Sequence, residues 1–512
     1  MNKKFVAVLA AVSLSFASAN TALAYKQETY SKQIQVEVHN TFTTSLTLNG
    51  VYKLENLTTK EMFFAMPNTP ITFSQVNGEV SIYQMGATMY SSQGYALHAV
   101  TGSEKIVVFR APVEGRKGAT ADYAVVKSYQ PFQGAKYVTE FTNGNGELWY
   151  SITDEQGVSS WVPAKDATLS SVVSQPLGKT PNGTQYRGSF NVVKSGSNVQ
   201  IVNRLDLENY LKGVIPNESP ASWHLEALKA QTVAARSYTL SKAGILSSTT
   251  KDQMYKGYSS EHKNSNAAVD ATSDLVVKYK GKLVQAYYYS TSGGRTANIG
   301  DVWNSTQVPQ FVSVDDSIEQ SPYKNWSVQI PVSNILTKFG FSPTDQLLDI
   351  KLTKGGANGE VTAVTAVTTA GEKTITGNET VMRNVFLDAS NKSLKSSWFD
   401  VAFTKPTGGG VNDITVQQAN GTTPVDSLTG VSVQTANGIV TIPEGSVSIQ
   451  TSTGVVNTDT VQTGIQSVTV NGKGYGHRIG MSQYGAKARA EAGWTYDRIL
   501  KHYYQGVTIE KY

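Results

Sequence analysis

The sequence predicts a β-rich α+β protein in which small all-β modules precede a mixed domain with one long helix. Three observations support this prediction. Short runs rich in Val, Ile and Thr alternate with Gly, Asn and Pro turns along most of the chain, as strands do. One stretch, from about Trp223 to Ala243, has the period and the alanine content of a helix. The 512 residues are too many for one compact domain, since domains usually span roughly 100–200 residues.

Residues 1–24 are expected to form an export signal. Lys3 and Lys4 precede an apolar stretch, and Ala22-Leu-Ala offers a small-x-small cleavage site. No later run reaches the ~20 apolar residues that a membrane helix needs. We therefore expect an exported mature chain that begins near Tyr25 and has no membrane span.

The composition excludes several classes of protein. The chain has no cysteine, so disulfides, thiolate metal sites and a thiolate nucleophile are excluded. The net charge of +5 falls to +3 once Lys3 and Lys4 leave with the signal. This mild excess suits an anionic polymer, but it lacks the concentrated basic surface of a nucleic-acid binder. We therefore expect no nucleic-acid partner.

Two β modules are expected before the mixed domain. Residues 25–126 contain β-prone runs such as Gln33–Val38 and Glu104–Phe109, and form the first. Residues 127–168 form the second, and their closing Gly-x-x-x-Trp-Val resembles the small barrel modules of Src-homology-3 type that attach to bacterial wall enzymes. Such a module would bind the wall through Trp149 and Trp161, or both tryptophans are simply core residues.

The mixed domain is expected to comprise residues 181–404 and 465–512, interrupted by a Gly/Thr/Ser-rich insertion at 405–464. A hairpin formed by Tyr186–Val193 and Asn198–Asn203 opens it. Ser219 and Pro220 are expected to cap the long helix and start its first turn. A stripe on that helix should face a sheet: Leu225, Leu228, Thr232, Ala235 and Thr239. A final helix is expected from about Ser482 to Ala492.

Three stretches gather small polar residues between glycines: Leu207–Tyr238, Ala286–Asp316 and Gly472–Tyr504. Glycines there allow the backbone to approach a ligand closely. The stretches contain the motifs Leu207-Glu-Asn-Tyr-Leu-Lys-Gly-Val-Ile-Pro-Asn-Glu-Ser-Pro, Tyr288-Tyr-Ser-Thr-Ser-Gly-Gly-Arg-Thr and Gly474-Tyr-Gly-His-Arg-Ile-Gly-Met-Ser-Gln-Tyr-Gly. Together these motifs resemble the SpoIID/LytB family, over about residues 186–403 and 468–512.

The resemblance implies a peptidoglycan protein whose partner is the glycan strand, and the export signal with the absence of cysteine favours a secreted protein of a Gram-positive cell wall. Two activities are open: a lytic transglycosylase that leaves 1,6-anhydro-muramic ends, or a protein that enhances a partner wall amidase. The role could be in sporulation or in autolysis. In transglycosylase members the acid of the Pro-x-Glu-x-Pro-type motif is catalytic, and here that residue is Glu218. One carboxyl group suffices, because the muramic C6 hydroxyl is the nucleophile and needs no second carboxylate.

Glu218 is expected just before the long helix, between Pro216 and Pro220. Burial beside Trp223 would raise the pKa of its carboxyl group, whereas a helix N-terminus would lower that pKa. The sequence leaves both effects open. The alternative interpretation is a glutamate that only stabilises the start of the helix.

Nine further residues are expected to bind substrate. Lys229 and Arg236 are seven residues apart and share a helix face, where they would bind stem-peptide carboxylates, hold Glu218 or form ordinary salt bridges. A loop of small donors should line a sugar groove, and residues of the last motif should contact its other side. These positions are Ser290, Ser292, Gly293 and Gly294 in the loop, and His477, Ser482 and Gln483 in the last motif.

The chain departs from the family pattern at two places. Some members bind zinc through His and Cys in His-Ser-Thr-Cys-Gly-Gly, but Tyr289 and Ser292 stand at those positions here, so we expect no metal and no cofactor. The usual Gly-His-Gly is Gly476-His477-Arg478. The bulky Arg478 is expected to alter access of substrate.

Overall fold

The computed structural model describes residues 33–404 and 464–512 without a break, together with short strand segments at 26–27, 415–418, 421–424, 432–435, 438–442, 447–451 and 454–458. The predicted export signal at 1–24 lies outside the described residues. The chain divides into two compact units. The first comprises the residues up to Ala221 and Lys242–Asp270, and the second comprises Ser222–Ser241 and Ala271–Tyr512.

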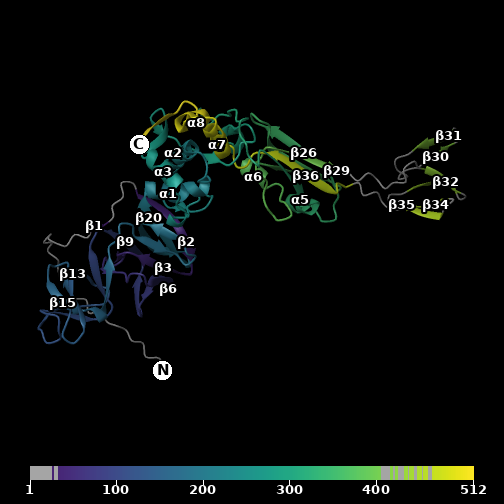
Figure 1. The fold of residues 1–512 in the computed structure, drawn as a ribbon. Coiled ribbons are helices and arrows are strands. Elements are labelled where there is room, and N and C mark those ends of the chain that lie inside the picture. Colours follow the sequence, from purple (N-terminus) through teal and green to yellow (C-terminus); the bar gives the residue numbers. More distant parts are fainter. Residues whose placement is uncertain are drawn as a thin grey trace, which may run out of the picture. The chain divides into compact units, whose positions relative to one another are not determined.

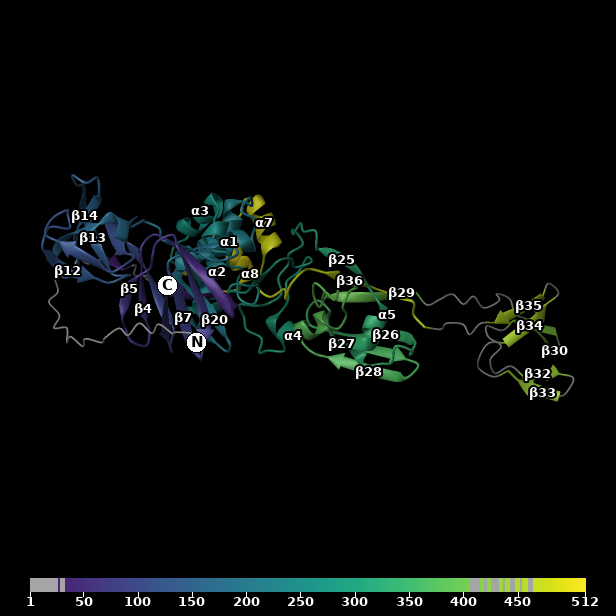
Figure 2. The same cartoon turned by 90° about the horizontal axis from the view of Figure 1, so that it is seen from below.

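The first unit is built on three sheets (Figures 1 and 2). The eight-stranded sheet contains β21 (Leu246–Ser247), β2 (Gln33–Thr41), β20 (Asn198–Asp206), β19 (Ser189–Ser195), β9 (Tyr95–Thr101), β4 (Tyr52–Asn56) and β5 (Met62–Phe64) in this order, with β1 (Lys26–Gln27) beside β9. The six-stranded sheet has the order β18 (Gln185–Arg187), β17 (Leu177–Lys179), β3 (Thr43–Asn49), β6 (Pro70–Val76), β7 (Glu79–Gln84) and β8 (Ala87–Ser91).

Strands from distant parts of the sequence are neighbours in the eight-stranded sheet. The hairpin predicted for Tyr186–Val193 and Asn198–Asn203 is confirmed, since β19 pairs with β20 from Ser189↔Arg204 to Ser195↔Asn198. Strand β20 also pairs with β2, and β19 pairs with β9. Strands from the segment 25–126 therefore flank the hairpin that leads into the first helix.

The third sheet has seven strands and includes most of the expected Src-homology-3-like segment. Its order is β12 (Val125–Tyr129), β11 (Val113–Arg116), β15 (Ser159–Pro163), β14 (Leu148–Thr153), β13 (Gly134–Thr142), β10 (Lys105–Phe109) and β16 (Ala167–Ser171). Its apolar cluster includes Val107, Phe109, Ile152 and Val162. Trp149 is buried, with 4% of its surface exposed, and Trp161 is half-buried.

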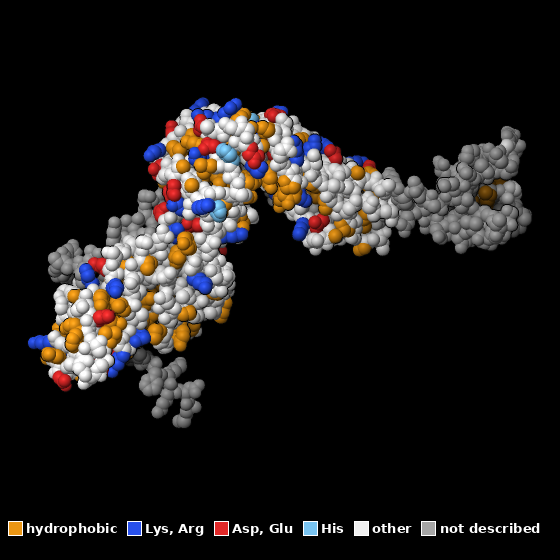
Figure 3. Space-filling view, viewed as in Figure 1, with side chains coloured by type: hydrophobic (Ala, Val, Ile, Leu, Met, Phe, Trp, Pro, Cys, Tyr) orange, Lys and Arg blue, Asp and Glu red, His pale blue; other side chains and the backbone are white. Residues whose placement is uncertain are grey.

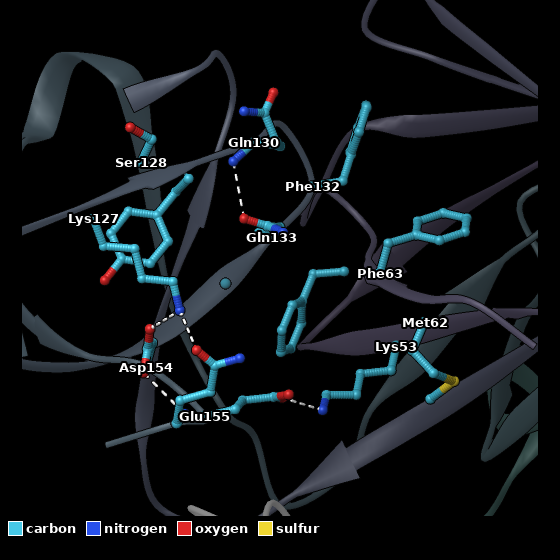
Figure 4. Close-up of a pocket in the computed structure, with 14 residues that line it drawn as sticks. Lys53, Met62, Phe63, Lys127, Ser128, Gln130, Phe132, Gln133, Asp154 and Glu155 are labelled. Carbon is cyan, nitrogen blue, oxygen red and sulfur yellow. Dashed lines mark hydrogen bonds and ion pairs between the residues drawn. The ribbon is translucent and has the colours of Figure 1, made fainter. Parts of the chain in front are cut away.

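A pocket of about 290 Å³ lies beside this sheet, where β4 and β5 meet it (Figure 4). Phe63 and Phe132 form its apolar side, and the Lys127 ammonium points to Asp154. A second ion pair, Lys53 to Glu155, crosses from β4. The lysines that line the pocket are therefore already neutralised by carboxylates, and we interpret it as a seam between sheets.

The first unit contains the helix α1 (Leu207–Glu218) and all but the last residue of α3 (Lys263–Ala271). The second unit contains α2 (Leu225–Ser241), α4 (Ile299–Trp303), α5 (Val332–Phe339), α6 (Glu379–Arg383), α7 (Gln483–Glu491) and α8 (Tyr496–Tyr503). Among the described residues there are thus eight α-helices, the longest being α2 with 17 residues. The structure is a β-rich α+β fold, as predicted, although helix is spread over many short elements. No helix within the described residues is long and apolar enough to cross a membrane.

The second unit has two apolar cores. In the first, α2, α7 and α8 pack with the sheet β23 (Lys282–Leu283), β22 (Leu275–Tyr279) and β38 (Thr508–Lys511). In the second, α5 and α6 pack with two sheets (Figure 2). These are β25 (Asn325–Ile330), β36 (Ser467–Lys473), β29 (Phe399–Thr404), and β26 (Leu347–Gly355), β27 (Glu360–Thr368), β28 (Gly371–Thr376).

The described parts of the predicted insertion at 405–464 are mostly hairpin strands. Three antiparallel pairs are formed by β30 (Thr415–Gln418) and β31 (Gly421–Pro424), β32 (Ser432–Thr435) and β33 (Gly438–Thr441), and β34 (Val447–Thr451) and β35 (Gly454–Thr458). On the face in Figure 3, basic and acidic side chains are interspersed, which agrees with the mild net charge.

Candidate functional site

Glu218 is the last residue of α1, a helix that the sequence did not reveal. Asp206 caps its start by accepting a hydrogen bond from the Asn209 N–H at 2.9 Å. The helix continues through Pro216, and Ser219 is its C-terminal cap. The expectation that Ser219 and Pro220 begin the next helix is therefore wrong. Glu218 lies at a helix C-terminus, where the exposed backbone carbonyls disfavour a negative charge.

A neighbouring loop holds the Glu218 carboxyl group. Its Oε1 accepts a hydrogen bond of 2.7 Å from the backbone N–H of Met254, and the side chain is half-buried. This donor favours the charged carboxylate and opposes the effect of the helix end. Met254 was not predicted, because a backbone N–H leaves no mark in a sequence.

A buried tyrosine next to Met254 fixes that loop against α1. The Tyr255 ring is 3% exposed and its hydroxyl donates to Asn203 of β20 at 2.7 Å. A Cβ at Gly213 would lie 2.6 Å from this ring, so α1 requires glycine at that point. The Lys256 N–H donates to the Gly213 carbonyl at 3.1 Å. The position of Glu218 therefore depends on β20, α1 and the loop together.

The other nine predicted residues belong to the second unit. On α2, the Lys229 ammonium pairs with Glu226 at 2.7 Å, and the other Glu226 oxygen accepts the Tyr496 N–H at 2.8 Å. Lys229 thus makes an ordinary salt bridge, one of the alternatives left open. Arg236 is fully buried and donates to the Leu275 carbonyl at 3.0 Å.

A buried glutamate organises the glycine-rich loop between β24 (Tyr288–Tyr289) and α4. Glu319 accepts hydrogen bonds from the N–H of Ser292 at 2.6 Å and of Gly293 at 3.2 Å, and from the Ser482 hydroxyl at 2.6 Å. Burial raises the pKa of Glu319, and these hydrogen bonds oppose that rise. Ser292 and Gly293 are buried, whereas Ser290 and Gly294 are half-buried.

Ser482 links this loop to α7. Its hydroxyl accepts from the Gly485 N–H at 3.0 Å, so it is the N-cap of α7, and Gln483 begins the helix. The helix predicted from about Ser482 to Ala492 is confirmed, but it is not the final one, because α8 follows it. A second buried carboxylate, Asp316, pairs with Arg489 of α7, and its Oδ1 accepts from the Tyr503 hydroxyl at 2.8 Å.

Glu319 and Asp316 were not among the predicted site residues. Acidic residues in loops are usually exposed, so their sequence does not predict that both are fully buried in the fold.

His477 has both ring nitrogens engaged by the backbone. Its Nε2 donates to the Tyr288 carbonyl at 3.1 Å, and its Nδ1 accepts from the Ile479 N–H at 3.1 Å. The rings of Tyr287, Tyr289 and Trp303 lie 5.1–6.1 Å from it. Burial lowers the pKa of His477 to about 4, so the ring is neutral at physiological pH. This arrangement indicates a structural histidine.

Arg478 is buried, with 1% of its surface exposed. Its guanidinium donates to the carbonyls of Ser292 and Arg295, each at 2.9 Å, and to Glu360 at 3.1 Å. Its carbon Cζ lies 4.3 Å from the centre of the Trp398 ring. The backbone has φ +64°, a left-handed conformation that explains why glycine is usual here. Arg478 supports the loop from within instead of projecting into an open site.

The side chains at the family's zinc positions do not fit a zinc ion. Zinc requires three or four nitrogen, sulfur or carboxylate ligands. Tyr289 is buried and packs on His477, and the Ser292 hydroxyl accepts from the Gly294 N–H at 3.0 Å. Within the described part of the chain, no three His, Asp or Glu residues are grouped to hold a metal.

Comparison with known proteins places these motifs in a family. The SpoIID family model, described as a stage II sporulation protein, matches residues 195–279, from the end of β19 through α1 and α2 to β22. The amidase enhancer of Bacillus subtilis is 37% identical over 311 residues, which cover 59% of this chain and 40% of that protein. This chain therefore matches less than half of the amidase enhancer's length.

Two further relatives match over most of their own length. An uncharacterized protein of Brachyspira hyodysenteriae is 30% identical over 349 residues, which cover 65% of this chain and 75% of that protein. The stage II sporulation protein D of Bacillus subtilis is 25% identical over 392 residues, covering 72% of this chain and 88% of that protein. The chain belongs to the SpoIID family.

Proposed function

We propose that the protein is a secreted lytic transglycosylase that cleaves peptidoglycan glycan strands between muramic acid and glucosamine, with Glu218 as its catalytic acid and base. The observation that carries the proposal is the Glu218 carboxyl group, half-buried at the end of α1 and oriented by the Met254 N–H at 2.7 Å. The helix end and this N–H donor act on its charge in opposite directions. The proposal requires this carboxyl group to act first in its protonated state and then in its charged state.

The chemistry needs both states in turn. The protonated Glu218 gives its proton to the glycosidic oxygen as the bond to the leaving sugar breaks. The resulting carboxylate then takes the proton from the muramic C6 hydroxyl, whose oxygen closes the 1,6-anhydro ring. The proton count balances without water, so one carboxyl group completes the cycle. The half-buried Ser290 and Gly294, with Gln483, are proposed to contact the glycan, while Ser292, Gly293, His477 and Ser482 shape the loop behind them.

Replacing Glu218 by glutamine tests this assignment. Glutamine can still accept the Met254 hydrogen bond, but it cannot donate and recover a proton. We expect Glu218→Gln to lower the rate of anhydro-muramic end formation at least ~100-fold, the lower range for general acid–base catalysis. Mass spectrometry of products from denuded glycan strands and from intact peptidoglycan measures these ends. Glu208→Gln, in the first turn of the same helix, is the matched control and should keep the wild-type rate.

A second function is favoured by one specific observation, the 37% identity to a protein named amidase enhancer. In this alternative the protein binds glycan and stimulates a wall amidase without cutting. The same preparation distinguishes the two. If the wild type forms no anhydro ends on either substrate yet accelerates release of stem peptides by an added amidase, the enhancer function is correct and the transglycosylase is excluded.

A further inference from the structure

A polar and aromatic pocket of about 460 Å³ lies on the sheet β25–β36–β29 of the second unit. Strand register brings its rim together: Asn325 pairs with Lys473, and Asn471 lies between Ser327 and Asp400. Paired residues point to the same face of a sheet, and all five of these side chains are exposed. Trp398, two residues before Asp400, is half-buried at the same end.

The strands beneath this pocket are firmly built. The Trp326 ring lies on the other face of the sheet from Asn325 and Ser327, is 8% exposed, and donates from its Nε1 to the Gly474 carbonyl at 2.8 Å. A Cβ at Gly472 would lie 2.1 Å from this ring, so glycine is required there. Trp398 contacts the buried Arg478, whose guanidinium carbon is 4.3 Å from the ring centre. The aromatic side of the pocket is therefore held by the same arginine that supports the Ser292 loop.

Several side chains on the rim are free to hydrogen-bond a ligand. In the described parts of the chain, no side-chain hydrogen bond or ion pair engages Asn325, Asn471 or the Lys473 ammonium, which lies 4.9 Å from the centre of the Trp398 ring. Asp400 is paired with Lys354. Each amide offers both donors and an acceptor, and the exposed lysine is free to leave the ring for an anion.

We propose that this pocket is a second glycan-binding site, which takes a strand of N-acetylated amino sugars and acts separately from Glu218. The apolar face of a sugar ring would pack on Trp398, and the two asparagines would bond its hydroxyl and acetamido groups. Lys473 would pair with a carboxylate where the sugar is muramic acid. The choice of wall glycan as the ligand rests on the proposed function, but the binding itself does not require cleavage.

Calorimetric titration of the full chain carrying Glu218→Gln with a hexamer of N-acetylglucosamine tests the site. The Glu218→Gln protein cannot cleave glycan by the proposed mechanism, so the titration measures binding without cleavage. We expect saturable binding that Asn471→Ala weakens roughly five- to tenfold, the usual effect of losing one hydrogen bond. Thr469→Ala, two residues away on the same face of β36, is the matched control and should leave the dissociation constant unchanged. Cellohexaose, which lacks the acetamido group, should bind more weakly.

Three results would overturn the proposal: no binding of the hexamer, equal binding by the Asn471→Ala and Thr469→Ala proteins, or equal affinity for cellohexaose. Both substituted side chains lie on the surface of the sheet, and an unchanged circular dichroism spectrum would exclude unfolding as the cause. Failure of this site leaves the Glu218 assay unaffected. Conversely, if the hexamer binds here but the wild type forms no anhydro product, the transglycosylase proposal is wrong and the glycan-binding site still holds.

Discussion

At the scale of single residues, backbone groups hold both nitrogens of the His477 ring. This histidine lies in the last glycine-rich motif and was predicted to contact substrate. Its two ring nitrogens are instead used by Tyr288 and Ile479. A backbone partner cannot be read from a sequence, so the prediction could name the position and not its partners.

The neutral His477 ring makes acid destabilisation a prediction. Its pKa is about 4 in the fold and about 6.5 in an unfolded chain, so the unfolded state binds the proton first as the pH falls. The stabilisation is complete above pH 6.5 and is lost between pH 6.5 and 4, by about 3 kcal/mol.

Urea unfolding across this range, followed by tryptophan fluorescence, measures the loss; five of the seven tryptophans belong to the second unit. His477→Gln should reduce this dependence, part of which remains with His502, whose pKa burial also lowers, whereas the exposed His262→Gln should keep it in full. Equal slopes in all three proteins would contradict the structural role of His477.

Arg478 gives a prediction in which two effects oppose each other. Arg478→Gly would relieve the left-handed backbone, worth about 1–2 kcal/mol. It would also leave the buried Glu360 without its cation, which costs about 3–5 kcal/mol. The second effect is larger, so we expect a net loss of roughly 1–4 kcal/mol of unfolding free energy.

The double variant Arg478→Gly/Glu360→Gln should regain part of this loss, because it removes the unpaired charge. A single variant as stable as the wild type would mean that backbone strain outweighs the ion pair. For both variants and the wild type, the measurement is the urea midpoint of the second unit at pH 7.

At the scale of elements, the strands and the helix α2 were predictable because their periodicity is local. The helix α1 was not predicted. The apolar residues from Leu207 to Ile215 are buried at helical spacing, but Ser219 and Pro220 behind them were predicted to start the next helix. Pro216 lies in the last turn of α1, where its missing N–H removes one intrahelical hydrogen bond close to the helix end. The prediction therefore placed Glu218 before the N-terminus of one helix instead of at the C-terminus of another, so the opposite end of a helix dipole faces it.

The glycine-rich loop shows the same limit. Its motif was recognised from Ser290 to Gly294, but the carboxylate that holds it, Glu319, is 27 residues beyond Ser292 in an unremarked segment. Long-range pairing of this kind depends on how β24 and β37 (Met481–Ser482) are brought side by side in parallel. This pairing arises from the tertiary structure, and no local pattern in the sequence predicts it.

At the scale of the whole molecule, the short runs of Val, Ile and Thr between turns correctly indicated a β-rich chain, because each strand leaves a local pattern in the sequence. The order in which the strands pair leaves no such pattern. β2 and β9, which come from the segment 25–126, flank the β19–β20 hairpin that leads into α1. The expected boundary at residue 181 passes through these sheets.

This pairing predicts that residues 181–512 alone will not fold as an intact domain. Without β2 and β9, the β19–β20 hairpin would expose two unpaired edges, which favour aggregation. Phe190, Val192, Ile201 and Val202, now buried, would lose neighbours, at about 1.5–3 kcal/mol for each side chain exposed. Such a sum approaches the whole stability of a typical domain, about 5–15 kcal/mol.

Soluble yield, size-exclusion chromatography and urea unfolding of this fragment should show aggregation or a non-cooperative transition, while residues 33–512 should unfold cooperatively. A monomeric, cooperatively folded fragment would instead establish residue 181 as a true domain boundary.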